Sequence, residues 1–270
     1  MEIMETGKKY IRVYSMFIKN ALITLMEYRA NFFISFAVEC LNFFFKIIYV
    51  LIIYKSGVTI EGISQNELQL FVGVYIFLSG IIYSFFLNNF NRLSEYVKNG
   101  DLDLLITKPI SLQFLVTMRY IDFGNLLPNL VGGGVMFFTA YSRLDLHMSF
   151  SHAVAFIALL IGSMVVSYAI MLIPSILSLW IVRTWGFYES VVQSLLEFNN
   201  MPMQIYHKHI VNIGVFMIPV LVITNFPVLF LLNKMPNLYL VWAAVVPFAV
   251  FFLSRLFWKF AIKRYVSASS

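Results

Sequence analysis

Long apolar runs separated by short polar passages form the pattern along most of the chain. A helix that crosses a bilayer needs about 20 consecutive, mostly apolar residues. We expect such spans at about 31–54, 68–87, 112–141, 153–181 and 238–260. Another, shorter span of about 17 residues ends near Pro202. A membrane β-barrel would show short alternating segments instead, so the pattern predicts an all-α polytopic membrane protein with six transmembrane helices.

Two segments do not fit a straight span. Residues 8–29 mix charged with apolar side chains, which indicates an amphipathic helix lying in the cytoplasmic interface. Residues 203–235 contain Pro219 and Pro227 within an apolar run. Broken helices at membrane depth occur only where protein or a cavity covers them. We therefore expect a re-entrant or external pair of half-helices before the last span, and a single domain over residues 1–270.

The charge distribution sets the expected orientation. Hydrophobic residues make up 60% of the chain and charged residues 12%, whereas soluble domains average about 25% charged. Cytoplasmic loops of membrane proteins carry an excess of Lys and Arg, so the side with more of them is inside. The predicted inner residues are Lys8, Lys9, Arg12, Lys19, Arg29, Arg92, Lys98, Lys108, Arg183, Lys259, Lys263 and Arg264, and the outer ones are Lys55, Arg143, Lys208 and Lys234. Both termini are therefore expected in the cytoplasm, and the net charge of +6 reflects topology rather than nucleic-acid binding.

The longest strongly polar passage between two apolar runs is NRLSEYVKNGDLDLLITKP, at residues 91–109. Leu93 and Val97 are at helical spacing, which predicts a short amphipathic helix. Gly100 can end this helix in the left-handed conformation, and Asp101 can cap the helix that follows. A segment with its own caps and its own apolar face is predicted to dock on something.

Three stretches then carry a family resemblance: MEYRANFF at 26–33, GDLDLLITKPIS at 100–111, and MPMQIY with IPVLVITNFPVLFLL within 201–232. They resemble the permease subunits of type-2 ABC exporters, in the bacterial branch whose second cytoplasmic loop reads G-D-L-D-x-x-L-x-x-P. The similarity extends over nearly the whole chain. It implies six helices per subunit, an interfacial N-terminal helix, a re-entrant element before the last helix, and a place in the bacterial cytoplasmic membrane.

The resemblance also implies a partner for the polar passage. In that family the loop between the second and third helices is a coupling helix that sits in a groove of a separate ATPase subunit. Its apolar side chains would enter the groove, and its acidic side chains would meet basic residues at the rim. The implied coupling residues are Leu93, Glu95, Val97, Gly100, Asp101, Leu102, Asp103, Leu104 and Pro109. From the residues alone, the alternative is that Asp101 and Asp103 only cap helices in a solvated loop.

The rest of the implied assembly follows from the same resemblance. Two copies of the ATPase would bind two permeases, as a homodimer or a heterodimer, within the lipid bilayer. The ATPase would hold ATP and Mg, and this chain would bind no cofactor and perform no chemistry. Other functions stay open: an ATPase-independent carrier, a membrane-embedded enzyme, or a permease-like scaffold or immunity protein. A lone enzyme needs a convergent catalytic set and a carrier often has an inverted repeat, and the sequence displays neither.

Charges within the predicted spans cost roughly 2.5–3.5 kcal/mol each at mid-helix, so each is a candidate functional residue. Glu39 and Lys46 lie two turns apart on one face of the first span, and they line a translocation path or form a structural pair with another helix. Arg119 is three residues before Asp122, which favours an intrahelical pair over a substrate contact. Two further acidic residues, Glu189 and Glu197, share roughly one face of the fifth span, and their role is open.

Glycine and histidine clusters receive a structural interpretation. Gly132, Gly133 and Gly134 lie within a span, where close helix packing or flexibility is expected rather than phosphate binding. His207 and His209 would point apart on a helix, and no carboxylate cluster accompanies them. No metal site is expected.

Overall fold

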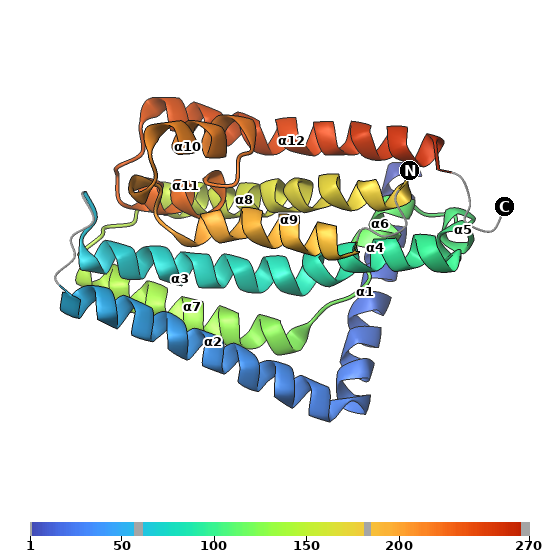
Figure 1. Ribbon diagram of the computed structural model, residues 1–270, viewed down its shortest axis with the longest axis horizontal. Coiled ribbons are helices and arrows are strands. Elements are labelled where there is room, and N and C mark those ends of the chain that lie inside the picture. The colour runs from blue at the N-terminus through green and yellow to red at the C-terminus, as the bar shows by residue number, and fades with distance from the viewer. Residues whose placement is uncertain (1, 57–61, 181–184, 266–270) are drawn as a thin grey trace.

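The computed structural model of the chain describes residues 2–56, 62–180 and 185–265, and the regular elements among them are helices without a strand (Figure 1). Four helices are long and apolar enough to cross a membrane, and a fifth crossing is counted if one bent pair is a single span. The four stretches are Arg29–Ile53, Gln65–Asn99, Phe150–Ile176 and Asn237–Lys263. The all-α membrane architecture is thus confirmed, and the count of six stays a prediction.

The long helices lie side by side in one bundle (Figure 1). They are α2 (Arg29–Ser56), α3 (Gln65–Ile82), α7 (Phe123–Arg143), α8 (Phe150–Ile176) and α12 (Asn237–Lys263). The first helix, α1 (Glu2–Glu27), crosses one end of the bundle steeply. This direction is the one expected of a helix lying along the membrane surface while the others cross it.

Shorter elements fill the ends and one side of the bundle. They are η1 (Tyr83–Leu87), α4 (Asn88–Asn99), α5 (Asp101–Ile106), α6 (Leu112–Thr117), η2 (Leu177–Leu179), α9 (Trp185–Glu197), η3 (Phe198–Asn200), η4 (Met203–Ile205), α10 (Lys208–Asn212), η5 (Ile213–Met217) and α11 (Val222–Leu231). With η3 following it directly, α9 covers most of the shorter span expected to end near Pro202, and residues 181–184 before it lie outside the described residues.

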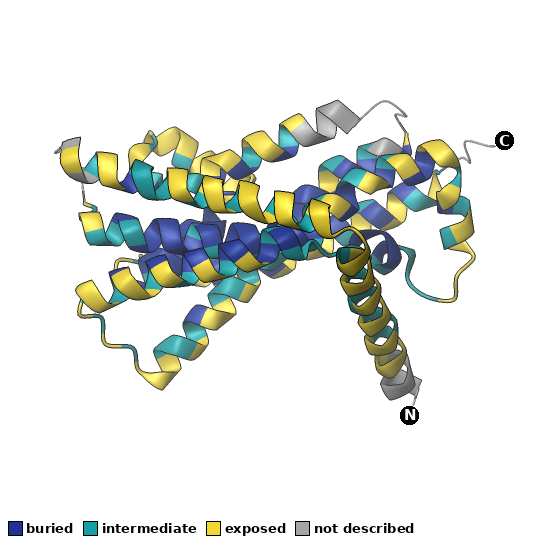
Figure 2. Cartoon of the chain, turned by 90° about the horizontal axis from the view of Figure 1, so that it is seen from below, coloured by how far each residue is buried: buried dark blue, intermediate teal, exposed yellow. Residues whose placement is uncertain are grey.

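Burial separates the central helix from the outer ones. In an apolar 18-residue stretch of Gln65–Asn99, 67% is buried inside the chain, compared with 6% in such a stretch of Arg29–Ile53. Figure 2 shows the same contrast, since α1 and α2 are largely exposed. A helix that is apolar all round belongs in a core. The bundle is therefore built around α3, and α2 presents its apolar surface outward, to lipid or to another protein.

The second span is longer than the sequence predicted. The helix does not end near residue 87 but continues through the π-helical turn η1 into α4, giving one helix from Gln65 to Asn99. It continues because α4 has its own buried face, made by Phe90, Leu93 and Val97. Gly100 then ends it with φ of 77°, the left-handed C-cap that the sequence indicated.

The third span, expected to be continuous over 112–141, is broken between α6 and α7. The break is possible because its backbone groups find partners across the bundle. The buried side chain of Asn89 accepts a hydrogen bond from Tyr120 N and donates one to Tyr120 O, both at 2.8 Å. Ser84 O, in the π-helical turn, accepts from Asp122 N at 3.1 Å. A π turn shifts the backbone hydrogen-bond pattern and is often found where a helix meets such a feature.

The segment before the last span folds as two short helical pieces at an angle. Lys208–Met217 and Val222–Leu231 are bent by 102° at a short break, the geometry of a broken span or a re-entrant loop. Nearly all of α11 is buried, as expected for irregular backbone that other protein covers. Polar side chains satisfy the surrounding backbone: Asn199 Oδ1 accepts from Thr224 N at 2.9 Å, and Asn225 Oδ1 from Met203 N at 2.7 Å.

Candidate coupling surface and intramembrane polar residues

The segment α4–α5–α6 lies at the end of the bundle where α1 begins and α12 ends (Figure 1). Gly100 separates α4 from α5, and a Cβ at this position would meet nothing within 4 Å. The glycine is therefore required by its positive φ and not by crowding. Asp101 does not cap α5, because Gly100 occupies the cap position. The first turn of α5 therefore has no side-chain cap. Asp101 is instead the first helical residue, where a negative charge is favourable beside the positive end of the helix.

The predicted coupling residues separate into buried and exposed groups. Leu93, Val97 and Leu102 are only 1%, 3% and 0% exposed. These three side chains pack inside this chain, so the expectation that they enter a partner's groove is corrected: they anchor the segment. Leu104 is 66% exposed, and Ile106, which the sequence analysis did not single out, is 45% exposed.

Most of the other predicted coupling residues are exposed as well. Glu95, Asp101 and Pro109 are exposed and Asp103 is half-buried. On α5, Leu104 lies one turn after Asp101, whereas Ile106, two residues after Leu104, points to another side of the helix. We call Leu104, Ile106 and Asp101 the α5 tip.

Contacts with α1 hold the chain that leaves α5. The hydroxyl of Tyr10 accepts a hydrogen bond from Ser111 N at 3.1 Å, and Lys9 Nζ donates to Pro109 O. The Phe114 ring packs against Tyr10 with a centroid distance of 4.9 Å. The N-terminal helix is thus attached directly to the segment that carries the α5 tip.

Glu39 lies in a polar cluster between α2 and α7. Asn125 Nδ2 donates to Glu39 Oε1 at 3.0 Å, and Asn129 Nδ2 donates to Glu39 Oε2 at 2.9 Å. Lys46, predicted on the same face, lies instead over the Tyr75 ring, 5.2 Å from its centroid. Glu39 therefore pairs with another helix, as one alternative held, but through amides and not through a salt bridge.

The other predicted intramembrane charges are placed differently from expectation. Asp122 is the N-cap of α7 and accepts from Gly124 N and Asn125 N at 3.0 and 3.2 Å. Arg119 lies in the break before α7 and not in a helix, so the intrahelical pair is wrong: a carboxylate at a helix start is stabilised better by the free N–H groups. Glu197 is exposed at the end of α9, and the side chain of Glu189 lies outside the described residues.

A second polar cluster was missed by the sequence analysis. Arg255 of α12 donates to Gln113 Oε1, Gln113 Nε2 donates to the Tyr168 hydroxyl at 2.9 Å, and that hydroxyl lies 3.1 Å from Thr117 Oγ1. These side chains come from α6, α8 and α12, so no local spacing joins them. An arginine within the last apolar run is costly, and that cost was the available signal.

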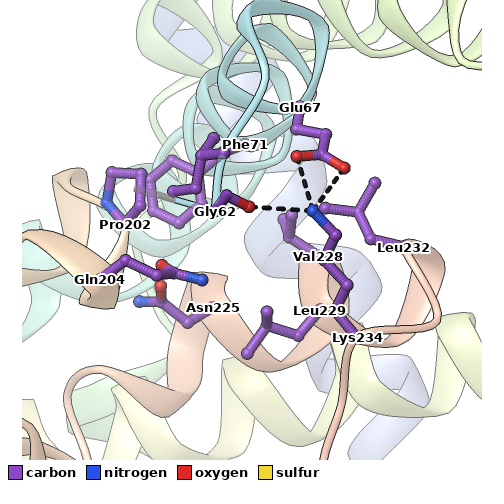
Figure 3. A pocket seen from close by; sticks show the side chains of 11 residues that line it. Gly62, Glu67, Phe71, Pro202, Gln204, Asn225, Val228, Leu229, Leu232 and Lys234 are labelled. Atoms are coloured by element: carbon purple, nitrogen blue, oxygen red, sulfur yellow. Dashed lines mark hydrogen bonds and ion pairs between the residues drawn. The ribbon is translucent and has the colours of Figure 1, made fainter. Parts of the chain in front are cut away.

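Lys234 forms an ion pair at the other end of the bundle (Figure 3). Its Nζ lies 2.8 Å from the Glu67 carboxylate and donates to Gly62 O at 2.9 Å. Glu67 also completes a capping box with Ser64 at the start of α3. The loop after α11 is thereby attached to the start of the central helix.

The histidines do not gather with other metal ligands. His207 is the N-cap of α10 with an extended backbone, so its ring comes 5.1 Å from that of His209, contrary to the expectation that they point apart. Among the described residues, no group of three or more His, Cys, Asp or Glu side chains could hold a metal ion.

A family model described as ABC-2 family transporter protein matches residues 40–269. This chain belongs to the ABC-2 transporter family. The match begins inside α2, so α1 lies outside it. No curated protein and no solved structure matches this member of the family.

In this ABC-2 family chain, the Glu39 cluster supports a reciprocal test. Asn129→Asp would place a second carboxylate against Glu39 in place of a donor, and buried like charges are strongly unfavourable. We expect a clear loss of thermal stability in detergent. Adding Glu39→Gln should restore most of it, because the amide then donates to the new carboxylate. Equal stability of the single and double variants would contradict the observed hydrogen bonds.

Proposed function

We propose that this chain is the permease subunit of an ATP-driven ABC exporter in the bacterial cytoplasmic membrane. The observation that carries the proposal is the α5 tip, where Leu104 and Ile106 are exposed although the same segment buries Leu93, Val97 and Leu102 inside the chain. Isolated exposed apolar residues are ordinary, but Leu104 and Ile106 project from a helix whose Leu102 is completely buried. Such a fixed apolar projection, flanked by acidic side chains, suits a groove with a basic rim on an ATPase.

The connections of α5 support a coupling role. On one side, α4 continues the central helix α3 without interruption. On the other side, α6 is held to α1 through Phe114 and Ser111. A displacement of the α5 tip by ATP-driven closure of the partner would therefore move the core helix and the interfacial helix together. The buried Leu93 and Val97 make this connection rigid.

The proposed assembly contains two permeases and two ATPase subunits. Substrate would move outward through a path between the permeases, and ATP with Mg would be held by the ATPase. The exposed apolar surface of α2 supports a second permease as one neighbour, with lipid as the other. In this arrangement the termini and the α5 tip face the cytoplasm, in line with the excess of positive charge predicted there. Six spans per subunit belong to the same proposal.

The proposal is tested by site-specific crosslinking in native membranes. A photoreactive residue at position 104 is expected to give an adduct that contains tryptic peptides of an ATPase with a Walker A motif, G-x-x-x-x-G-K-[ST]. The same residue at position 248 provides the control, since Phe248 is 78% exposed near the middle of α12. Adducts without an ATPase at position 104, or the same ATPase at both positions, would argue against coupling through α5.

A further inference from the structure

A polar cleft of about 570 Å³ lies in the angle between α1 and α2. Its other walls are the beginning of α4 and the break that precedes α7. None of the coupling residues or intramembrane carboxylates except Asp122 lines it. The cleft is therefore separate from the α5 tip and from the Glu39 cluster.

Two arginines meet in this cleft around one aromatic ring. The guanidinium of Arg92 lies 4.1 Å from the centroid of Tyr120, and that of Arg119 lies 5.5 Å from it. The Tyr120 backbone is fixed by its two hydrogen bonds to buried Asn89. Among the described residues, neither arginine forms an ion pair. The structure thus holds two positive groups, without an anionic partner, over a positioned ring.

Asp122 is the only carboxylate that lines the cleft among the residues that the structure describes, and its hydrogen bonds are made elsewhere. Asp122 uses Oδ1 to accept from Gly124 N and Asn125 N at the start of α7. Its negative charge therefore faces the positive end of a 21-residue helix. The remaining polar lining includes Asn20, Asn31 and Asn88, which can donate further hydrogen bonds.

Apolar side chains also line the cleft. Phe17 and Leu25 come from α1, Phe32 from α2, and Phe123 from α7. A cleft lined by both guanidinium groups and apolar rings suits an amphipathic ligand better than a free ion. The steep crossing of α1 against the bundle places the cleft where an interfacial helix meets membrane-crossing ones (Figure 1).

We propose that this cleft binds the phosphate headgroup of an anionic membrane lipid, with Arg92 and Arg119 on the phosphate and the apolar wall along the acyl chains. The planar fork of arginine matches phosphate oxygens in a bidentate way. Basic pockets between helices on the cytoplasmic side are suited to such headgroups. The inference rests on the cytoplasmic position of α1 in the proposed function. A bound lipid would brace α1 against α2 and the break before α7.

The experiment measures lipid retention by the purified full-length chain in detergent, using native mass spectrometry. Phosphatidylglycerol is compared with phosphatidylcholine of the same acyl chains. The test variant is Arg92→Gln/Arg119→Gln, and the matched variant is Lys19→Gln/Lys98→Gln. The latter removes the same charge from exposed positions on α1 and α4 that do not line the cleft. Equal elution volumes and thermal midpoints show that all forms fold, and Arg119→Gln alone is used if the double variant does not.

We expect the wild type to retain phosphatidylglycerol in preference to phosphatidylcholine, and the arginine variant to lose at least about tenfold of this binding, because two charge-assisted contacts are removed. The lysine variant should stay within about twofold of wild type. Equal losses in both variants, equal retention of both lipids, or displacement of the lipid by millimolar inorganic phosphate would overturn the proposal. Because no ATPase is present, a failed coupling assignment would leave this result unchanged.

Discussion

Leu104→Arg is expected to abolish stimulation of the partner ATPase by this chain in lipid nanodiscs. Leu104 is 66% exposed, so its replacement costs this chain little internal packing, whereas a charge entering an apolar groove loses its hydration without compensation. Side chains central to an interface contribute about 2 kcal/mol or more, which corresponds to a loss of about 30-fold in affinity. The measurement is ATPase activity together with recovery of the complex on an affinity column.

Two controls separate an apolar contact from a general charge effect. Leu104→Met keeps the size and polarity of the side chain and should retain association. Ser15→Arg adds the same charge at an exposed position of α1 and should behave like wild type. If Leu104→Arg retained full stimulation, or if Ser15→Arg lost it equally, the α5 tip would not be the docking surface.

Local backbone chemistry was readable from the sequence in the coupling segment. Gly100 follows a helix and precedes an acidic run, and its left-handed conformation was predicted because glycine adopts a positive φ without steric cost. The direction of Leu93 and Val97 could not be predicted. Their helical spacing shows that they share a face, but not whether this chain or a partner covers that face. Burial by distant helices decides that point.

The break before α7 shows the same limit more sharply. Arg119 and Asp122 stand at the spacing of a helical ion pair, and the apolar residues around them continue into the next span. Asn89, about 30 residues earlier, instead bonds the backbone of Tyr120 on both sides. A single buried amide thus makes a non-helical segment acceptable at this depth. No pattern within the segment itself contains that information.

Close packing or flexibility was expected for the three consecutive glycines, and the structure shows close packing at Gly132 and Gly133 but open space at Gly134. This difference permits a comparison of neighbouring positions. A Cβ on Gly133 would lie 2.6 Å from Phe77 N and 2.9 Å from Gly73 O of α3. Both obstacles are backbone atoms of the central helix, which cannot rotate aside. On Gly132 the Cβ would meet the ring of Phe43 at 2.8 Å, and on Gly134 it would meet nothing within 4 Å.

Alanine substitutions at these positions should therefore change the stability of the chain in different directions. We expect Gly133→Ala to destabilise the chain by about 3 kcal/mol, at the upper end of overpacking costs, because α7 must move away from α3. Gly132→Ala should cost less, since a ring can shift. Gly134→Ala should be neutral or stabilise by up to about 1 kcal/mol, because alanine favours a helix over glycine. Thermal midpoints in detergent give the order, and a Gly133→Ala variant as stable as Gly134→Ala would rule out the close backbone contact between α3 and α7.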